Sequence, residues 1–190
     1  MSYVFHDTAV IDEGAKIGSG TRIWHFTHIS KGAVIGDGCS LGQNVFIGDK
    51  VLIGNNVKIQ NNVSVYEGVI LEDDVFCGPS MVFTNVYNPR SHVKRKHEYR
   101  TTLVKHGATI GANATIICGV TLGEFSFIGA GSVVKSDVRA YEMIVGVPGK
   151  HVGWMCECGI RLTEEPANKS LVCGTCGLKY ILDHNGCHKL

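Results

Sequence analysis

An aliphatic residue, or one of similar character, recurs at every sixth position through the first half of the chain. The series begins at Ile11 and continues without a slip through thirteen positions to Phe83. A smaller residue precedes each of these by two positions, and Gly, Asn and Asp fill the places between. A period of six does not match the 3.6-residue period of a helix, whereas inward side chains two apart match a strand. Each hexapeptide is therefore predicted to be a short strand followed by a tight corner.

Repeats of this kind predict an all-β protein, because three strands and their corners make one coil of a parallel β-helix. Successive coils would stack at about 4.8 Å, the spacing of neighbouring strands. The period stops after Phe83, resumes at Val104 and continues to Ala140. We therefore expect residues 1–150 to form a prism and residues 84–103 to form an external loop. Long loops in repeat proteins are usually functional or disordered, and a merely tolerated basic insertion is the alternative.

The charge balance narrows the classes of partner. Lys and Arg total 18 and Asp and Glu total 17, so the formal net charge is +1. This balance argues against nucleic acid, which calls for a basic surface. The first residues lack the features of a signal peptide, and no apolar run approaches the roughly 18 residues of a membrane span. We expect a cytoplasmic protein, in which disulfides are rare.

The six-residue period is lost in residues 151–190, a tail that holds five of the eight cysteines. Four of them form two close pairs separated by 14 residues, which are Cys156 with Cys158 and Cys173 with Cys176. Four thiols in two pairs suit tetrahedral zinc, so the tail is predicted to be a small structural zinc ribbon without a catalytic role. Two alternatives stay open. The thiols could be metal-free, or a nearby side chain could replace one ligand, namely Cys187, His184 or His188.

Several motifs, together with the repeat, resemble a known family. The prism, the external loop and the closing Gly-Val-Pro-Gly-Lys turn resemble the left-handed β-helix acyltransferases. Four segments are similar to nucleotide-linked aminosugar N-acetyltransferases, at residues 22–29, 40–48, 58–65 and 72–90. They most resemble the enzymes that acetylate the 3-amino group of UDP-2-acetamido-3-amino-2,3-dideoxy-D-glucuronate for bacterial surface polysaccharide (O-antigen). The resemblance covers about residues 1–155 and implies a left-handed helix, a homotrimer with sites between subunits, and acetyl-CoA as co-substrate.

The resemblance also implies a residue that holds the sugar amine, and it maps onto Asn85. An amide oxygen can accept a hydrogen bond and orient the amine, but it cannot act as a base. Asn85 would therefore act by positioning. The alternative is a turn-forming asparagine where the chain leaves the prism.

A base, where one is used, is predicted to be His25. It follows the inward Ile23 by two positions and should point outward. Residues 18 apart share a column, so His25, Gln43 and Asn61 should form a polar ladder on one outer face. This ladder is interpreted as the wall of a groove that holds nucleotide or sugar against a neighbouring subunit, with a solvated face as the alternative.

The external loop and the later coils supply the remaining candidates. Arg90 could hold the pyrophosphate or the uronate carboxylate through a bidentate fork, and Tyr66 or Tyr87 could stack on uracil. An ordinary surface or packing role is the alternative for each. The resemblance implies that the pantetheine arm of acetyl-CoA meets backbone near Gly129, Ala130 and Ser132. Its phosphates and adenine end would meet Lys135, Arg139, Pro148 and Lys150.

The sequence bears on three rival interpretations. A γ-type carbonic anhydrase needs three histidines on one metal, but no histidine precedes His92 and His97 by about 35 residues. A non-catalytic β-helix scaffold would not bind acetyl-CoA. An N-acetyltransferase for another nucleotide-linked aminosugar, such as a dTDP-linked 3-amino-6-deoxyhexose, would share the chemistry but need no cation for a carboxylate.

Overall fold

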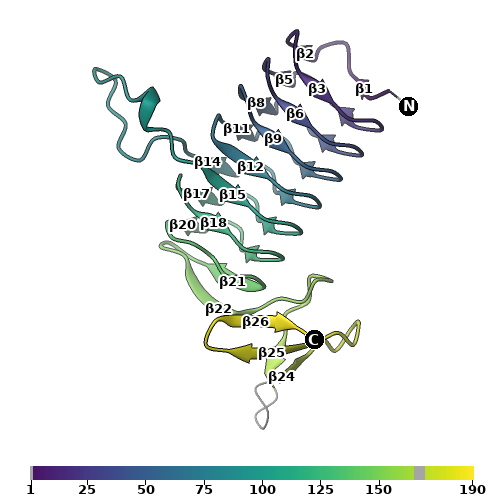
Figure 1. Ribbon diagram of the computed structural model, residues 1–190, viewed down its shortest axis with the longest axis vertical. Coiled ribbons are helices and arrows are strands. Elements are labelled where there is room, and N and C mark those ends of the chain that lie inside the picture. Colours follow the sequence, from purple (N-terminus) through teal and green to yellow (C-terminus); the bar gives the residue numbers. More distant parts are fainter. Residues whose placement is uncertain (1, 165–169) are drawn as a thin grey trace.

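The computed structural model describes residues 2–164 and 170–190. Within them, the strands from Val4 to Val145 form a parallel β-helix whose coils stack along one axis, as Figure 1 shows, and residues 150–154 add one antiparallel strand. The predicted all-β parallel helix is confirmed. Each coil contributes one short strand to each of three sheets.

Sheet A runs along the prism in the order β1 (Val4–Phe5), β4 (Arg22–Ile23), β7 (Ser40–Leu41), β10 (Lys58–Ile59), β13 (Phe76–Cys77), β16 (Thr109–Ile110), β19 (Phe127–Ile128), β21 (Glu142–Val145) and β22 (Lys150–Trp154). Sheet B comprises β2 (Val10–Ile11), β5 (His28–Ile29), β8 (Phe46–Ile47), β11 (Ser64–Val65), β14 (Val82–Phe83), β17 (Thr115–Ile116) and β20 (Val133–Val134). Sheet C comprises β3 (Lys16–Ile17), β6 (Val34–Ile35), β9 (Leu52–Ile53), β12 (Val69–Leu71), β15 (Thr102–Val104) and β18 (Thr121–Leu122).

The register explains the six-residue period. Ile29 lies beside Ile47, and Ile47 lies beside Val65, so residues 18 apart stack directly. The second residue of each two-residue strand is buried from β4 to β20, as are the smaller residues two positions earlier, and together they fill the prism. The first residue of each two-residue strand is less buried and points outward, and in β12 and β15 the middle residues Ile70 and Leu103 take this place. These outward residues therefore form the outer surfaces of the three sheets.

The last coil differs from the expectation. Ile128 pairs with Ile144, which is 16 residues away rather than 18, and Leu122 bridges to Val138. The prediction that Ala140 continues the inward series was wrong, because Val138 occupies that place and is buried. The coil is two residues shorter, which a sequence period of six does not anticipate.

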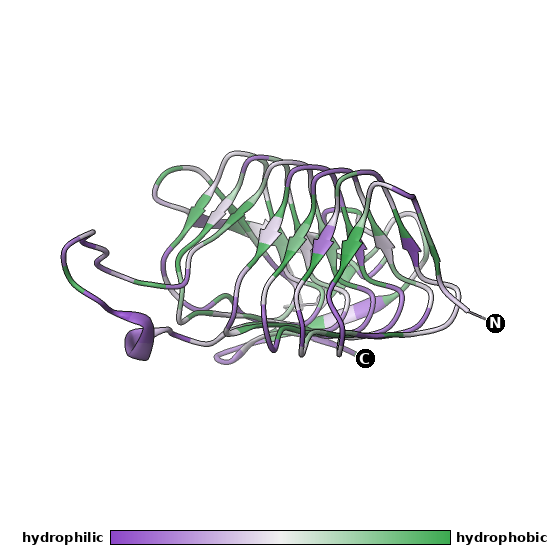
Figure 2. Ribbon diagram, turned by 90° about the horizontal axis from the view of Figure 1, so that it is seen from above, coloured by the Kyte–Doolittle hydropathy of each residue, from purple (hydrophilic) through white to green (hydrophobic). Residues whose placement is uncertain are grey.

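The external loop leaves the prism after β14 and returns at β15. Val104 lies in register beside Leu71, so the chain resumes its stacking after the excursion. Thr102 is already paired and buried, so the loop ends two residues earlier than expected. It contains a short 3₁₀ helix, η1 (Lys96–Glu98). Figure 2 shows the loop reaching away from the prism, with hydrophilic residues at η1.

Beyond β22 the tail forms an antiparallel sheet of β23 (Thr163–Glu164), β24 (Ser170–Val172), β25 (Lys179–Asp183) and β26 (Gly186–Lys189). This sheet lies at the C-terminal end of the prism (Figure 1). Its buried side chains pack with Tyr141 and Trp154 and against Phe125 of the last coils. In residues 2–164 and 170–190, no helix is long and apolar enough to cross a membrane.

Candidate functional site

The predicted polar ladder exists at the corner between sheets A and B. The Asn44 N–H donates to the His25 carbonyl at 3.0 Å, and the Gln43 N–H donates to Asn61 Oδ1 at 2.9 Å. His25, Gln43 and Asn61 line an open pocket of about 360 Å³ together with Trp24. The structure therefore brings three of the predicted residues together on one outer corner.

Aromatic rings gather at the N-terminal end of this corner. The His25 ring stacks on that of His6 with centroids 3.5 Å apart, and the Trp24 ring lies nearly parallel to His25 at 6.3 Å. Trp24 and Phe26 are 49% and 58% exposed, which is high for large rings. Phe26 also has a φ of 58°, a left-handed conformation that costs a non-glycine residue about 1–3 kcal/mol. In the same place of later coils this conformation is taken by Asn44, Asn62, Ser80 and Asn113.

Two histidine–carboxylate pairs on the prism were missed in the sequence. His28 Nε2 lies 3.2 Å from Asp12 Oδ1 on the outer face of sheet B, and His106 Nδ1 lies 3.6 Å from Asp74 Oδ2 on the corner after β15. All four side chains are between 41% and 45% exposed. The sequence could have predicted both pairs, since outward residues on adjacent coils are neighbours. A search for columns 18 apart overlooks such diagonal contacts.

Asn85 lies apart from His25. It lies two residues after the end of β14, at the corner where the chain leaves sheet B for the external loop, and its carbonyl accepts from the Arg100 N–H at 3.2 Å. His25 precedes β5, which is three coils earlier in sheet B. At a strand spacing of about 4.8 Å, three coils amount to about 14 Å along the axis. One chain therefore does not bring these two predicted catalytic residues into contact.

Tyr66 and His106 lie closer to Asn85 along the prism axis than His25 does. Tyr66 lies one coil before Thr84 in the same column, and Thr84 precedes Asn85 in the chain. The Tyr66 ring lies 6.1 Å from the Phe46 ring. His106 follows β15, the strand that the chain enters after the loop, so it belongs to the same coil as Asn85. Of these, Tyr66 was expected near the substrate and His106 was not.

The external loop presents cationic and aromatic groups. Tyr87 is 61% exposed, and the Arg100 guanidinium lies 4.6 Å from its ring centroid. Arg90 is exposed, and its guanidinium donates to the Pro89 carbonyl at 3.2 Å. Arg95, by contrast, is held by both oxygens of Glu98 at 2.8 and 2.9 Å. Arg90 is thus placed where an anionic ligand could reach it.

The residues expected to meet acetyl-CoA lie on the last coils, and two of them already have structural contacts. The buried Ser132 Oγ accepts from the Gly146 N–H at 3.1 Å. Arg139 pairs with Glu142 at 3.1 Å, and its guanidinium lies 4.8 Å from the Trp154 ring centroid. Lys135, Pro148 and Lys150 are exposed, as is Arg139, while Gly129 and Ala130 form a corner of the coil.

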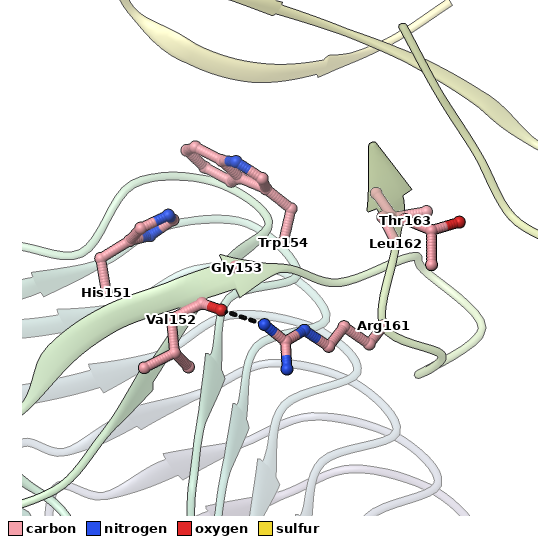
Figure 3. A pocket seen from close by; sticks show the side chains of 7 residues that line it. All are labelled: His151, Val152, Gly153, Trp154, Arg161, Leu162 and Thr163. Atoms are coloured by element: carbon pink, nitrogen blue, oxygen red, sulfur yellow. Dashed lines mark hydrogen bonds between the residues drawn. The ribbon is translucent and has the colours of Figure 1, made fainter. Parts of the chain in front are cut away.

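A pocket of about 710 Å³ lies where the prism meets the tail. Figure 3 shows its lining, with His151 and Trp154 on one side of β22 and Arg161, from the segment before β23, reaching Val152 on the other. The Arg161 guanidinium donates to the Val152 carbonyl, and His151 Nδ1 lies 3.0 Å from Glu142 Oε1. Sequence reasoning missed this pocket because it forms between segments that have no repeat in common.

The four paired cysteines of the tail converge. The sulfurs of Cys156, Cys158, Cys173 and Cys176 all lie within 4.8 Å of one another. Backbone N–H groups of Cys176 and Thr175 directed at the Cys173 sulfur lower the pKa of that thiol to about 6. The alternative ligands lie elsewhere. Cys187 is buried in the apolar cluster of the tail, and His188 Nε2 lies 3.1 Å from Asp183.

Comparison with known proteins agrees with the repeat. The family model of the bacterial transferase hexapeptide matches residues 14–49 and 101–136, and that of the succinyltransferase hexapeptide repeat matches residues 32–67. A dTDP-3-amino-3,6-dideoxy-α-D-galactopyranose 3-N-acetyltransferase from Aneurinibacillus thermoaerophilus is 42% identical over 79 residues. This match covers 42% of the present chain and 40% of the relative. A Bacillus subtilis serine acetyltransferase is 43% identical over 53 residues, which is 28% of this chain and 24% of that protein.

Solved structures share the fold. A hexapeptide-repeat acetyltransferase from Vibrio cholerae, complexed with acetyl coenzyme A, aligns with a TM-score of 0.50 and 25% identity, covering 74% of this chain and 70% of that chain. The acetyltransferase domain of PglB from Neisseria gonorrhoeae aligns with a TM-score of 0.53 and 19% identity over 79% of this chain and 57% of that chain. The chain thus matches less than half the length of its curated relatives. Together, the repeat, the fold and these partial matches show that the chain is similar to hexapeptide-repeat transferases, and one of the relatives is named as a nucleotide-sugar N-acetyltransferase.

Proposed function

We propose that this protein transfers an acetyl group from acetyl-CoA to the amino group of a nucleotide-linked aminosugar. The observation that carries the proposal is that two sets of groups flank sheet B, with the aromatic corner at His25 before β5 and Asn85 after β14, three coils later. A nucleotide sugar is a long molecule with a planar base at one end and the reacting sugar at the other. A site of two parts, about 14 Å apart along the axis, suits such a substrate.

The chemistry requires a neutral, oriented amine. Its nitrogen attacks the thioester carbonyl, a C–N bond forms, the C–S bond breaks, and the nitrogen's proton is finally carried by the CoA thiol. A sugar amine is less basic than lysine, so a fraction is already neutral near pH 7. Asn85 would hold this amine through its amide oxygen, and alignment of the two reactants lowers the barrier.

The axial separation bears on which histidine could accept the proton. In a cyclic trimer with its prisms parallel to the symmetry axis, every copy of a residue lies at the same height. The heights of His25 and His28 then differ from that of Asn85 by three coils in every subunit. His106, supported by Asp74, lies on the coil of Asn85. We therefore assign His25 to the nucleotide end and His106 of a neighbouring copy to the reacting end.

A trimer fits the outer surface of sheet C. Four apolar residues pair with one another along adjacent strands of this sheet and form one outward row, namely Val34, Leu52, Ile70 and Leu103. Leu52 is 45% exposed in the single chain. We propose that this row packs against a second copy. Light scattering after size exclusion should give three chains for the wild type and a smaller species for Leu52→Glu.

The sugar is proposed to be the UDP-linked 3-amino-uronate of bacterial surface polysaccharide. A uronate carries a carboxylate, and Arg90 is an exposed guanidinium on the loop beside Asn85. A dTDP-linked 3-amino-3,6-dideoxyhexose is the second candidate, because the Aneurinibacillus relative is named for that substrate. That sugar has no carboxylate and would leave Arg90 to the pyrophosphate.

The experiment that tests the function measures thiol release from acetyl-CoA with a panel of acceptors. The panel holds the UDP-linked 3-amino-uronate, the dTDP-linked 3-amino-3,6-dideoxyhexose and UDP-N-acetylglucosamine, which has no free amine. Turnover with the uronate alone supports both chemistry and sugar. Turnover with the dTDP sugar alone would keep the chemistry and overturn the sugar. If none of the amines gives thiol release, the result would favour a non-catalytic β-helix scaffold.

Variants separate the two parts of the site. Asn85→Ala and His106→Asn should lower kcat, the latter by about 10²- to 10⁴-fold, the usual contribution of a general base. His25→Asn should instead raise KM for the nucleotide sugar. Arg90→Ala should raise that KM by about ten- to a hundred-fold, since a charged hydrogen bond is worth about 1.5–3 kcal/mol. Lys94→Ala, on the same loop, is the matched control. A kcat loss confined to His25→Asn would contradict the assignment of His106.

A further inference from the structure

The four converging thiols of the tail have the geometry of a metal site. Zinc bound by four thiolates at about 2.3 Å places the sulfurs about 3.8 Å apart. Here Cys156 Sγ lies 3.4 Å from Cys176 Sγ, and Cys158 Sγ lies 3.5 Å from Cys173 Sγ. All four sulfurs fall within 4.8 Å of one another. The spacing agrees with a tetrahedral set to within about an ångström.

The thiols come from two loops that the tail sheet brings face to face. Cys156 and Cys158 lie between β22 and β23, while Cys173 and Cys176 lie between β24 and β25. The first loop is closed by the Cys156 N–H, which donates to the Ile160 carbonyl at 2.8 Å, and by the Gly159 N–H, which donates to the Cys156 carbonyl at 2.8 Å. The second is closed by the Gly177 N–H, which donates to the Cys173 carbonyl at 2.9 Å. Two tight turns that present paired sulfurs to one point are the framework of a zinc ribbon.

The tail is too small to be held by its own core. A module of about 40 residues buries little apolar surface and usually needs a metal, a disulfide or a partner. Its cysteines are free thiols. Much of its apolar cluster is shared with the prism, through Tyr141 and Trp154. A bound metal is therefore the cross-link that could stabilise the tail.

Contacts link the thiols directly to the last coil. Cys156 Sγ lies 3.1 Å from the Tyr180 hydroxyl, which also accepts from the Glu157 N–H at 3.1 Å. The Tyr180 ring meets Tyr141 edge-on at 5.2 Å, and Tyr141 stacks on Phe125 at 5.7 Å. This series of contacts runs from the sulfur cluster to a corner of the prism. Ordering the thiols would thus order the surface that covers the end of the prism.

We propose that these four cysteines bind one Zn²⁺, and that the zinc-bound tail is the cap that closes the C-terminal end of the β-helix. Repeat folds need caps because the terminal coil has no neighbour to cover its core. Four thiolates in tetrahedral array select zinc or iron, and a site with four protein ligands is closed, so its role is structural. Binding replaces the four thiol protons by the metal. The proposal is independent of the proposed acetyl transfer.

The cap has a consequence for the junction pocket. Arg161 follows the first thiol loop and is bridged to Met155, which precedes it. Its guanidinium reaches across to the Val152 carbonyl and forms one wall of the pocket in Figure 3. Metal loss should therefore open this pocket as well as release the tail sheet.

The first test is metal content of the full chain. Elemental analysis should find one zinc per wild-type chain, and exchange for Co²⁺ should produce thiolate charge-transfer and tetrahedral ligand-field absorption. Cys176→Ser should lose the metal, and because Cys176 is exposed, little packing is lost with it. Cys187→Ser, a buried cysteine outside the cluster, should keep one zinc. Iron in place of zinc, full zinc in Cys176→Ser, or a folded wild type without metal would each overturn the proposal.

The second test reports on the cap and does not require a variant of a ligand. The chain has two tryptophans, Trp24 and Trp154. In Trp24→Phe protein, emission comes from Trp154 alone, which is 7% exposed at the junction. A strong zinc chelator should shift this emission to longer wavelength and raise amide exchange in β24 to β26, while amides of β8 and β11 stay protected. Unchanged emission and exchange after complete zinc removal would show that the cap does not depend on the metal.

Discussion

A methyl group added at Gly36 should disrupt the stacking of coils. Gly36 lies below Gly54 on one corner of the prism, and a Cβ there would sit 2.5 Å from the Gly54 carbonyl oxygen and 2.6 Å from its carbonyl carbon. These are backbone atoms of the next coil, so they cannot rotate away. A normal contact would require the two coils to separate locally by about 0.8 Å. Protein interiors are close-packed and already respond to a change of one methylene, so this separation is large.

The cost follows from the contacts at that corner. Overpacking of this kind costs about 1–3 kcal/mol. Separation also strains the ladder in which the Asp37 N–H donates to Asn55 Oδ1 at 2.9 Å, a hydrogen bond worth about 1 kcal/mol. The unfolded chain returns about 0.4–1 kcal/mol, because Ala is less flexible than Gly. The net destabilisation is about 2 kcal/mol.

For a chain of this size, 2 kcal/mol lowers Tm by about 4–8 °C. Thermal unfolding followed by far-UV circular dichroism, together with urea denaturation, would measure the change. Gly174→Ala is the control, because a Cβ there meets nothing within 4 Å. A Gly36→Ala protein with the Tm of the wild type would refute the reasoning, since it would show that the coils can part without loss.

Three further predictions follow from other contacts. Burial acts to raise the pKa of Glu142, but hydrogen bonds from Arg139 outweigh it and hold the pKa below its usual value of 4.5. The stabilisation is therefore present above about pH 4.5 and is lost as pH falls through the folded pKa, and urea titrations should show a flatter acid limb in Glu142→Gln. Phe26→Asn should leave Tm nearly unchanged, because relief of the left-handed strain offsets the lost apolar contact, while KM for the nucleotide sugar rises in the thiol-release assay. Ile116→Ala, which truncates a fully buried side chain, should cost about 2–5 kcal/mol in urea denaturation.

The sequence predicted well what depends on local periodicity. The inward series ending at Phe83, the excursion after it and the corner column of His25, Gln43 and Asn61 all follow from residues that are 18 apart. The paired cysteines could be recognised as a cluster because ligand spacing within a turn is also local. Errors began where the period changed, as at the shortened last coil with Val138 in place of Ala140.

The sequence by itself determined the coil, its three faces and the residues that share each corner, because a two-residue strand period and an 18-residue coil leave one arrangement of inward and outward side chains. Tertiary structure decided the rest. The diagonal pair of His28 with Asp12, the heights of His25 and Asn85, and the pocket between β22 and Arg161 depend on how coils and tail are stacked. Such contacts join residues with no fixed spacing in the chain, so packing in three dimensions alone sets them.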